Sequence, residues 1–316
     1  MMLLHHPALV QRLGLAENLR SFYAQTRNVI QADPACMEYD PELTYVLRRS
    51  GCSFSNIEFK TDVKGNSKGF RDDEVSLSGP RIILLGDSVS MGWGVREDQS
   101  YASLMEKELG WPILNTGISS YGTVRELRVL NRVDMSQIKL IVIQYNNNDL
   151  EENINFFRRS FQIMEKDDFW EQMRVYRNSL KYWPGKALQW TFDEIFRSYQ
   201  RALRRSSREK VAPFRPSSSS FLEARAFLFT LKHASPASIG QCPIIVFDPS
   251  VYRTDFLKQL QYIQQRFPFD PLLRRLVLVD ALPLNKDNFF ILDDHPNVRG
   301  HRVIADALVQ TIRKNI

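Results

Sequence analysis

The chain has little cysteine and no long apolar run. Its three cysteines, Cys36, Cys52 and Cys242, are odd in number and their spacings suit neither a zinc site nor a disulfide framework, so we expect reduced structural thiols. No run approaches the roughly 20 apolar residues that a membrane-spanning helix needs. Residues 1–10 are too short and too broken by two histidines and a proline for a signal peptide, so we expect a cytoplasmic protein, with export as the alternative.

Cofactor signatures are missing as well. The sequence contains no glycine-rich phosphate-binding loop and no histidines, cysteines and carboxylates at metal-ligand spacing, so we expect neither a metal nor an organic cofactor. The chain does have size and apolar content. Its 316 residues, of which 43% are hydrophobic, are sufficient for one main domain with a large core.

Apolar runs and helical patterns alternate along the chain. The runs typical of strands occupy residues 82–85, 112–114, 140–145, 243–247 and 275–279. The helical patterns occupy residues 100–109, 124–132, 254–267 and 302–313. Such alternation predicts an α/β fold built on a parallel, doubly wound sheet.

The first of these runs ends abruptly in Gly86-Asp87-Ser88. A buried strand followed by a glycine-rich turn is how many α/β enzymes present a nucleophilic hydroxyl at the carboxyl edge of a sheet. The same tripeptide also forms an ordinary turn, in which Asp and Ser bond to the local backbone. For Asp87 we expect this bracing role, and Ser88 is the candidate nucleophile.

A second polar segment, Asp293-Asp294-His295, follows the last apolar run and precedes a helical pattern. A neutral imidazole takes a proton from a serine hydroxyl only if its other ring nitrogen is held by an acceptor. The segment therefore supplies a candidate base, His295, and an acid that orients it. Asp293 is the expected acid and Asp294 is the alternative. The segment also has the features of a helix N-terminus, and that role is compatible with catalysis.

Two further strand-like runs end in small or polar residues, within residues 113–123 and 141–149. Acyl transfer passes through an oxyanion, which needs two or three fixed donors about 3 Å away. The loop around Ser120 can offer backbone N–H groups, and Asn148 can offer its side-chain amide. Three consecutive asparagines also make an ordinary turn, but in a parallel sheet they would share an edge with Ser88.

In this order along the chain, the four segments resemble the SGNH hydrolases, also called the GDSL esterase and lipase family. The resemblance implies a flavodoxin-like doubly wound parallel sheet. It also implies that Ser88 is the nucleophile and His295 the base. The oxyanion hole would then consist of the Ser88 and Ser120 N–H groups and the Asn148 amide.

Two positions depart from the family pattern. Ser120 stands where the family has its oxyanion-hole glycine. The N–H survives this change, but the backbone conformation must suit a residue with a Cβ. Leu292 stands three residues before His295, where the family often has its acid, so we expect Asp293 to take that role.

The resemblance covers about residues 40–150 and 240–316. It extends to the lead-in of one bacterial branch of the family, in which a Tyr-Asp-Pro segment, here residues 39–41, and a Gly-Phe-Arg turn, here residues 69–71, precede the nucleophile strand. The pattern of these segments is also that of an edge hairpin with a glycine-bearing turn.

We expect an N-terminal lead-in, residues 1–80, packed on an SGNH hydrolase domain, residues 81–316, with a helical insertion at 151–220. The insertion holds 14 Lys and Arg against nine Asp and Glu, which is +5 of the net charge of +6. Because it follows Asn148, it is placed to act as a lid or acyl-binding wall, with an auxiliary helical layer as the alternative. Its aromatic residues include Phe161, Phe169, Tyr176, Tyr182, Trp183, Phe196 and Tyr199, and its basic residues cluster at Arg197, Arg201, Arg204, Arg205, Arg208 and Lys210.

These features predict a serine esterase that hydrolyses a carboxylic ester through a Ser-His-Asp triad. The expected substrate carries a short O-acyl group on a carbohydrate or a lipid. One alternative is an O-acetyltransferase that uses the same residues; another is a catalytically silent SGNH fold that serves as a binding module. The expected partner is a small-molecule, glycan or lipid ester. The basic insertion also predicts peripheral contact with an anionic membrane surface. No nucleic-acid partner is expected, because no binding module is recognisable.

Overall fold

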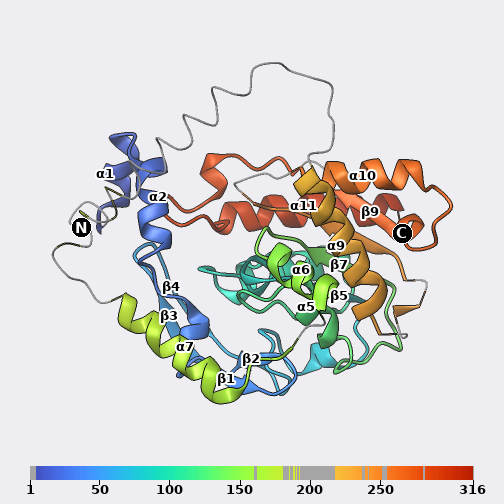
Figure 1. Cartoon of the computed structure of the whole chain (residues 1–316), viewed down its shortest axis with the longest axis horizontal. Coiled ribbons are helices and arrows are strands. Elements are labelled where there is room, and N and C mark those ends of the chain that lie inside the picture. Colours follow the sequence, from blue (N-terminus) through green and yellow to red (C-terminus); the bar gives the residue numbers. More distant parts are fainter. Residues whose placement is uncertain are drawn as a thin grey trace.

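The computed structural model of the chain describes residues 5–159, 162–180, 185, 188, 190, 192, 218–236, 239–240, 242–250, 255–279 and 282–315. At its centre lies a parallel sheet of five strands in the order β6-β5-β7-β8-β9 (Figure 1). The strands are β5 (Ile82–Leu85), β6 (Ile113–Asn115), β7 (Leu140–Gln144), β8 (Ile244–Phe247) and β9 (Leu276–Val279). Counted along the chain, this is the 2-1-3-4-5 order of a flavodoxin-like doubly wound sheet, which confirms the predicted fold class.

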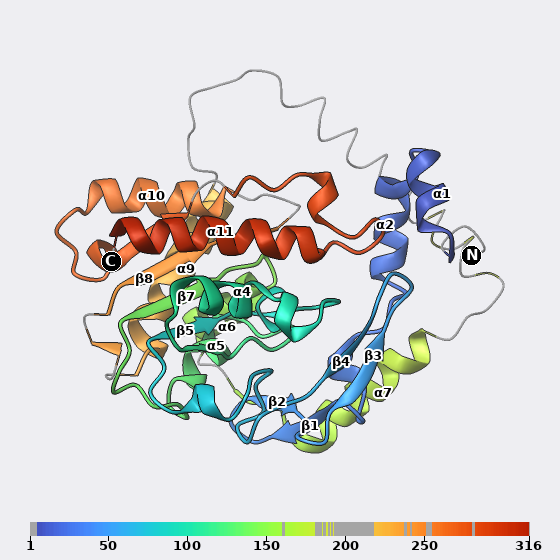
Figure 2. The ribbon, with the colours of Figure 1, turned by 180° about the vertical axis from the view of Figure 1, so that it is seen from behind.

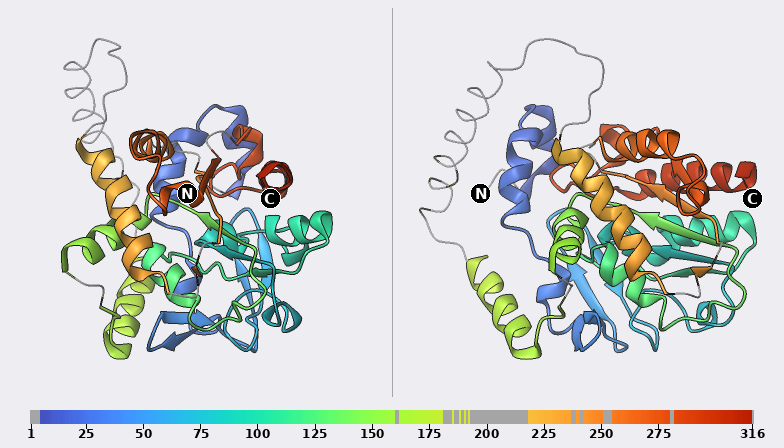
Figure 3. Two further views of the ribbon diagram at one scale, coloured as in Figure 1. Left: turned by 90° about the vertical axis from the view of Figure 1, so that its right-hand side faces the viewer. Right: turned by 45° about the vertical axis from the view of Figure 1, so that its right-hand side comes forward.

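Helices cover both faces of the sheet, because successive side chains of each buried strand point to opposite faces. The covering helices are α4 (Tyr101–Leu109), α5 (Thr123–Val129), α9 (Ser218–Ala234), α10 (Phe256–Arg266) and α11 (Val298–Asn315). Ile83 and Leu85 of β5 pack with α5, α9 and α10, whereas Ile82 and Leu84 pack with α4 and α11. Figure 2 shows α4 and α11 together on one side of the sheet, and Figure 3 shows α9 on the other.

The predicted strands agree with the observed strands to within one residue. Helix ends agree less well: α5 ends at Val129, three residues before its predicted end, and α11 begins at Val298, four residues before its predicted start. Asn297 explains the early start of α11. Its side-chain oxygen accepts the backbone N–H groups of Arg299 at 2.9 Å and Gly300 at 3.2 Å, and so caps the helix.

The lead-in consists of two antiparallel hairpins and several short helices beside the central sheet (Figure 2). Its elements are α1 (Pro7–Arg12), α2 (Ala16–Ala24), the 3-10 turn η2 (Ile30–Ala32), β1 (Met37–Asp40), β2 (Thr44–Leu47), β3 (Cys52–Ser55), β4 (Lys60–Val63) and the 3-10 turn η3 (Val75–Leu77). Val10, Phe22 and Tyr23 pack on Leu292, the residue before the candidate acid. The lead-in therefore contacts a loop that lies more than 200 residues later in the chain.

Two helices of the predicted insertion are described, α6 (Asp149–Arg159) and α7 (Lys166–Ser179). Helix α6 packs beside α5 and α9, and α7 packs on β1 and η2 of the lead-in. Phe169 of α7 also stacks on Tyr45 of β2, with ring centroids 5.2 Å apart. The basic cluster from Arg197 to Lys210 lies outside the described residues, as do Phe161, Tyr182, Trp183, Phe196 and Tyr199. Among the helices that are described, none is both long and apolar enough to cross a bilayer.

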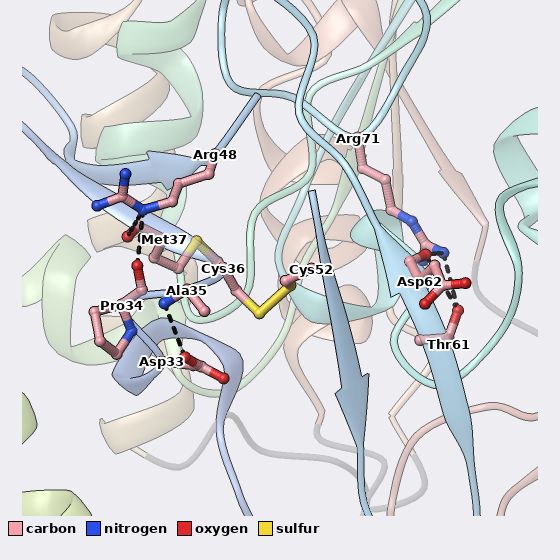
Figure 4. Close-up of a disulfide and its surroundings, with 10 residues drawn as sticks. All are labelled: Asp33, Pro34, Ala35, Cys36, Met37, Arg48, Cys52, Thr61, Asp62 and Arg71. Atoms are coloured by element: carbon pink, nitrogen blue, oxygen red, sulfur yellow. Dashed lines mark hydrogen bonds between the residues drawn. A yellow bond between two sulfur atoms is a disulfide. The ribbon is translucent and has the colours of Figure 1, made fainter. Parts of the chain in front are cut away.

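Cys36 and Cys52 form a disulfide, so the prediction of reduced thiols is wrong for this pair (Figure 4). Cys36 directly precedes β1 and Cys52 begins β3. The packing of the two hairpins brings their Cα atoms to 5.1 Å, within the range that a disulfide can span. Their spacing of 16 residues carries no signal of this contact, because the contact depends on how two separate hairpins pack. Cys242 is a free thiol, as predicted.

Arg71, from the Gly-Phe-Arg turn, is buried, and its guanidinium lies beside Thr61 and Asp62 of β4 (Figure 4). It also braces the glycine-rich turn that follows the candidate nucleophile. Its guanidinium donates to the carbonyl oxygens of Met91 at 3.2 Å, Gly92 at 2.7 Å and Val95 at 2.9 Å. Burial lowers its pKa to about 10, so the group remains a cation near neutral pH. Through Arg71, the Gly-Phe-Arg turn of the lead-in is thus hydrogen-bonded to the turn that follows the candidate nucleophile.

Replacing both bridged cysteines, Cys36→Ser together with Cys52→Ser, is expected to lower the free energy of unfolding by about 3 kcal/mol, because the cross-link restricts the unfolded chain. Urea denaturation followed by circular dichroism measures this change. As a control, thiol titration of the unfolded wild-type protein should detect one thiol without reductant, Cys242, and all three cysteines after reduction. Detection of all three before reduction would contradict the disulfide.

Candidate active site

The turn after β5 places Ser88 at the carboxyl edge of the sheet. Gly86 begins this turn with a φ of +157°, and a Cβ on it would lie 2.1 Å from Ser90 Oγ, so only glycine fits. The Asp87 carboxylate accepts the backbone N–H two residues later at 3.0 Å and caps the short helix α3 (Ser88–Met91). Asp87 therefore braces the turn, as predicted.

Ser88 and His295 are hydrogen-bonded although 207 residues separate them, with 2.7 Å between Ser88 Oγ and His295 Nε2. The other ring nitrogen, Nδ1, lies 2.5 Å from Oδ1 of Asp293, whose side chain is fully buried. Trp93 stacks on the imidazole with ring centroids 4.8 Å apart, and its indole N–H donates to Asp293 Oδ2 at 3.2 Å. The structure therefore joins the candidate nucleophile, base and acid in one chain of hydrogen bonds.

Of the two candidate acids, Asp293 makes the shorter contact with the imidazole. Asp294 Oδ1 lies 3.3 Å from His295 Nδ1, against 2.5 Å for Asp293 Oδ1. The Asp294 side chain is also 33% exposed. The geometry thus favours Asp293 as the group that orients the ring, and it places Asp294 as a second carboxylate beside it.

Arg27 of the lead-in bridges these two carboxylates. Its Nη1 atom lies 2.6 Å from Asp293 Oδ1 and 2.7 Å from Asp294 Oδ1. The guanidinium also lies over the Trp93 ring, 5.3 Å from its centroid. Burial lowers the pKa of Arg27, but the attraction of both carboxylates outweighs burial. The pKa is therefore raised above its ordinary value, and the group stays charged.

Glu58, also from the lead-in, holds the backbone of the acid loop. Its carboxylate accepts the N–H groups of Ile291 at 2.7 Å and of Leu292 and Asp293 at 2.8 Å. Hydrogen bonds to a carboxylate are about twice as strong as those between neutral groups. Three of them on consecutive residues fix the path of the chain into Asp293 and His295.

The surrounding charges control the protonation of His295. Burial alone lowers the pKa of the imidazole, but the attraction and hydrogen bond of Asp293 outweigh it, and the pKa is raised to about 9. Burial raises the pKa of Asp293, but the contacts with His295 and Arg27 dominate and hold it below its ordinary value. The acid is therefore ionised at neutral pH, and the imidazole is predominantly a free base only above about pH 9.

The loop after β6 holds Ser120 in a left-handed backbone conformation, with a φ of +61°. A residue with a Cβ pays about 1 kcal/mol or more in this region, so the conformation needs support. Gln31 of η2 provides it through both ends of its amide. Its Nε2 donates to Ser120 Oγ at 2.9 Å, and its Oε1 accepts from Ser119 Oγ at 3.2 Å. Arg125 adds a bond to the Ser120 carbonyl at 2.6 Å.

Asn148 lies between β7 and α6 and reaches the same loop. Its Nδ2 donates at 3.2 Å to the carbonyl oxygen of Tyr121, the residue after the left-handed serine. Asn146 Nδ2 donates to Asp87 Oδ2 at 3.0 Å, and the Ile118 N–H donates to the carbonyl of the first glycine in the nucleophile turn at 3.2 Å. These bonds join the three strand-end turns that were predicted to share one edge of the sheet.

Within the described residues, one group of side chains is close enough to share a cation: Asp293, Asp294 and His295, whose ligand atoms lie within 4.8 Å of one another. Arg27 Nη1 contacts an oxygen of each carboxylate and lies 3.4 Å from His295 Nδ1. The positive charge at this group is therefore supplied by a side chain of the protein.

Sequence reasoning missed four residues of the site: Arg27, Gln31, Glu58 and Trp93. A signal existed for Trp93, which lies in the glycine-rich turn directly after the nucleophile motif. The other three lie in the lead-in, far from every strand-end motif. Their spacing from His295 or Ser120 carries no information, because the contacts depend on how the lead-in packs.

No family model matches the chain, and no curated protein matches it. Solved structures with a similar fold include a member of the lipolytic G-D-S-L family from Veillonella parvula, with 9% identity and a TM-score of 0.37 over 74% of this chain and 98% of that one. They also include an acetyl xylan esterase from Butyrivibrio proteoclasticus, with 13% identity and a TM-score of 0.39 over 74% of this chain and 63% of that one.

A salicylyl-acyltransferase from a tetracycline biosynthetic pathway is similar too, with 12% identity and a TM-score of 0.41 over 75% of this chain and 55% of that one. These are similarities of fold at low identity. Because the TM-scores lie below 0.5, the activity of this chain is argued from its own side chains.

Proposed function

We propose that this chain is a serine esterase of the SGNH family that hydrolyses a carboxylic ester. The observation that carries the proposal is the chain of hydrogen bonds from Ser88 Oγ to His295 Nε2 and from His295 Nδ1 to Asp293 Oδ1. His295 removes the hydroxyl proton as Ser88 attacks the ester carbonyl, and Asp293 stabilises the imidazolium that forms. The imidazolium then protonates the departing alcohol, and water attacks the acyl-enzyme by the same route.

The oxyanion of each tetrahedral intermediate is assigned to the backbone N–H groups of Ser88 and Ser120 and to the Asn148 amide. Support for this assignment comes from the bonds that hold the nucleophile turn, the Ser120 loop and the turn before α6 together at one sheet edge. Fixed donors of this kind are most effective where they need no rearrangement during the reaction.

For the substrate we propose an O-acyl ester with a short acyl group on a carbohydrate or lipid alcohol. The intact hydrogen-bonded triad weighs against a catalytically silent binding module, because such a module needs no base aligned on a serine. An acyltransferase would use the same first step and differ only in the acceptor, so it is an outcome that the assay below distinguishes.

The disulfide bears on where the enzyme acts. Disulfides persist in oxidising compartments and are rare where thiols are kept reduced. The Cys36–Cys52 bridge therefore favours the export alternative over the cytoplasmic location expected from the sequence. We propose an oxidising compartment as the site of action.

A fluorophosphonate probe is expected to label Ser88, as located by mass spectrometry, because an aligned base activates that hydroxyl alone. Ser88→Ala should abolish labelling and lower hydrolysis of 4-nitrophenyl acetate by about 10³-fold or more, with an unchanged circular dichroism spectrum. Ser136→Ala, at an exposed serine, is the matched control and should behave as wild type.

Retained hydrolysis in Ser88→Ala would refute the proposed nucleophile. Labelling without hydrolysis, together with transfer of the acetyl group to an added sugar, would identify an acyltransferase.

The pH profile of hydrolysis provides a second test. Because the pKa of His295 is raised to about 9 and the free base is the active form, kcat/KM should rise with pH and level off above about pH 9. Steady-state rates from pH 6 to pH 10 measure this, after incubation at each pH to exclude unfolding. A profile that is flat or falls between pH 7 and pH 9 would contradict the assigned base.

A third test concerns the Ser120 loop. Gln31→Ala should lower kcat by about fivefold, corresponding to about 1 kcal/mol, because the left-handed conformation loses its support. In a Ser120→Gly background the same change should have little effect, since glycine adopts a positive φ freely. Comparing kcat and KM for the four proteins measures the coupling. Equal losses in both backgrounds would show that Gln31 does not act through the Ser120 conformation.

A further inference from the structure

The site contains one carboxylate more than a Ser-His-Asp triad requires. Asp293 Oδ1 lies 2.5 Å and Asp294 Oδ1 lies 3.3 Å from the same imidazole nitrogen of His295. One carboxylate orients the ring. A second negative charge at this distance stabilises the imidazolium further and so keeps the base protonated to a higher pH.

Arg27 is positioned to offset that second charge. Its Nη1 contacts both carboxylates at 2.6 and 2.7 Å and lies 3.4 Å from His295 Nδ1. Its side chain is 14% exposed, so solvent screens these interactions less than it would at the surface. A single guanidinium nitrogen thus lies at the centre of the two acids and the base.

Several contacts hold Arg27 in this place. Tyr176 of α7 donates its hydroxyl to the Arg27 carbonyl at 3.1 Å. Arg20 of α2 donates to the carbonyl oxygens of Phe290 at 3.2 Å and Ile291 at 2.9 Å, which ties the preceding helix to the acid loop. The Arg27 Nε atom, in contrast, is buried and has no partner among the described residues. In the orientation that brings Nη1 to both carboxylates, the Arg27 side chain therefore leaves one hydrogen-bond donor unpaired.

We propose that Arg27 is a positioning residue of the active site, which holds the two carboxylates around His295 and cancels the charge of Asp294. This inference rests on the proposed function, in which His295 acts as the base. Without Arg27, the imidazole would face two uncompensated carboxylates and would act as a base only at higher pH. The lead-in thereby sets the pH range in which the enzyme works.

The titratable groups that interact with His295 come from four parts of the chain. They are Asp87 beside the nucleophile, Asp293 and Asp294 in the acid loop, Arg27 after α2, and His301 in α11. Burial lowers the pKa of His301 to about 3, so this residue is neutral. Among these groups Arg27 is therefore the permanent cation.

The test follows the titration of His295 itself. Protein with 13C-labelled histidine is titrated by NMR, and the His295 signal is assigned by its loss in His295→Gln. The variants are Arg27→Met, Arg27→Lys, Asp294→Asn and the double variant Arg27→Met with Asp294→Asn. The rate of Ser88 labelling by a fluorophosphonate is recorded at each pH on the same samples.

Removing the cation favours the imidazolium, so Arg27→Met should move the His295 midpoint up by about one pH unit and slow labelling at pH 7 about tenfold. Asp294→Asn removes an anion and should move the midpoint down. Arg27→Lys keeps the charge and should stay near wild type. The double variant restores the net charge and should also titrate near wild type.

An unchanged midpoint in Arg27→Met, or a midpoint in Arg27→Lys equal to that of Arg27→Met, would overturn the proposal. If Arg27→Met does not fold, the double variant decides: a midpoint at or above that of wild type supports the offset of Asp294, and a midpoint as low as that of Asp294→Asn alone refutes it. Absence of labelling at every pH in wild type would refute the serine esterase instead, while the NMR titration would still report on Arg27.

Discussion

The hydrogen bond between Ser88 and His295 joins segments 207 residues apart, and the geometry of the whole site depends on it. Ser88 is fixed by the end of a sheet strand. His295, in contrast, lies on a loop well beyond the last strand, so the sheet alone does not set its position. Glu58 and Arg27 of the lead-in do so, through the loop backbone and through the carboxylates. The lead-in is thus part of the candidate active site.

Charge balance explains how this site tolerates burial. Buried ions are costly unless they are paired and hydrogen-bonded. Asp293 and Asp294 contribute two negative charges and Arg27 one positive charge, so the group becomes neutral when His295 carries a proton. In the proposed reaction, His295 reaches this protonated state when Ser88 attacks the ester. The arrangement therefore stabilises the charge that develops in the proposed reaction.

The Ser120 loop, on the other side of the site, is also held by a residue of the lead-in. Ser120 keeps a left-handed backbone where the SGNH hydrolases that the sequence resembles have glycine, and Gln31 of η2 supports that conformation from outside the loop. Cys36 lies four residues after η2, and its bridge to Cys52 ties this part of the chain to the second hairpin. A single stretch of the lead-in, from Arg27 to Gln31, consequently contacts both the acid loop and the Ser120 loop.

Much of the fold was predictable because it depends on local patterns. Apolar runs identify the five strands, and the parallel order places the residues that end β5, β6 and β7 at one edge, so Ser88, Ser120 and Asn148 could be named as candidates in advance. His295 followed from the Asp-x-His pattern. The sequence already favoured Asp293 over Asp294 as the acid, and the distances to His295 agree with that choice. The roles of Arg27, Gln31 and Glu58 and the disulfide, in contrast, were decided by tertiary structure alone. Each of these depends on hairpins and turns packing against distant loops, and a contact made that way leaves no periodicity or spacing in the sequence.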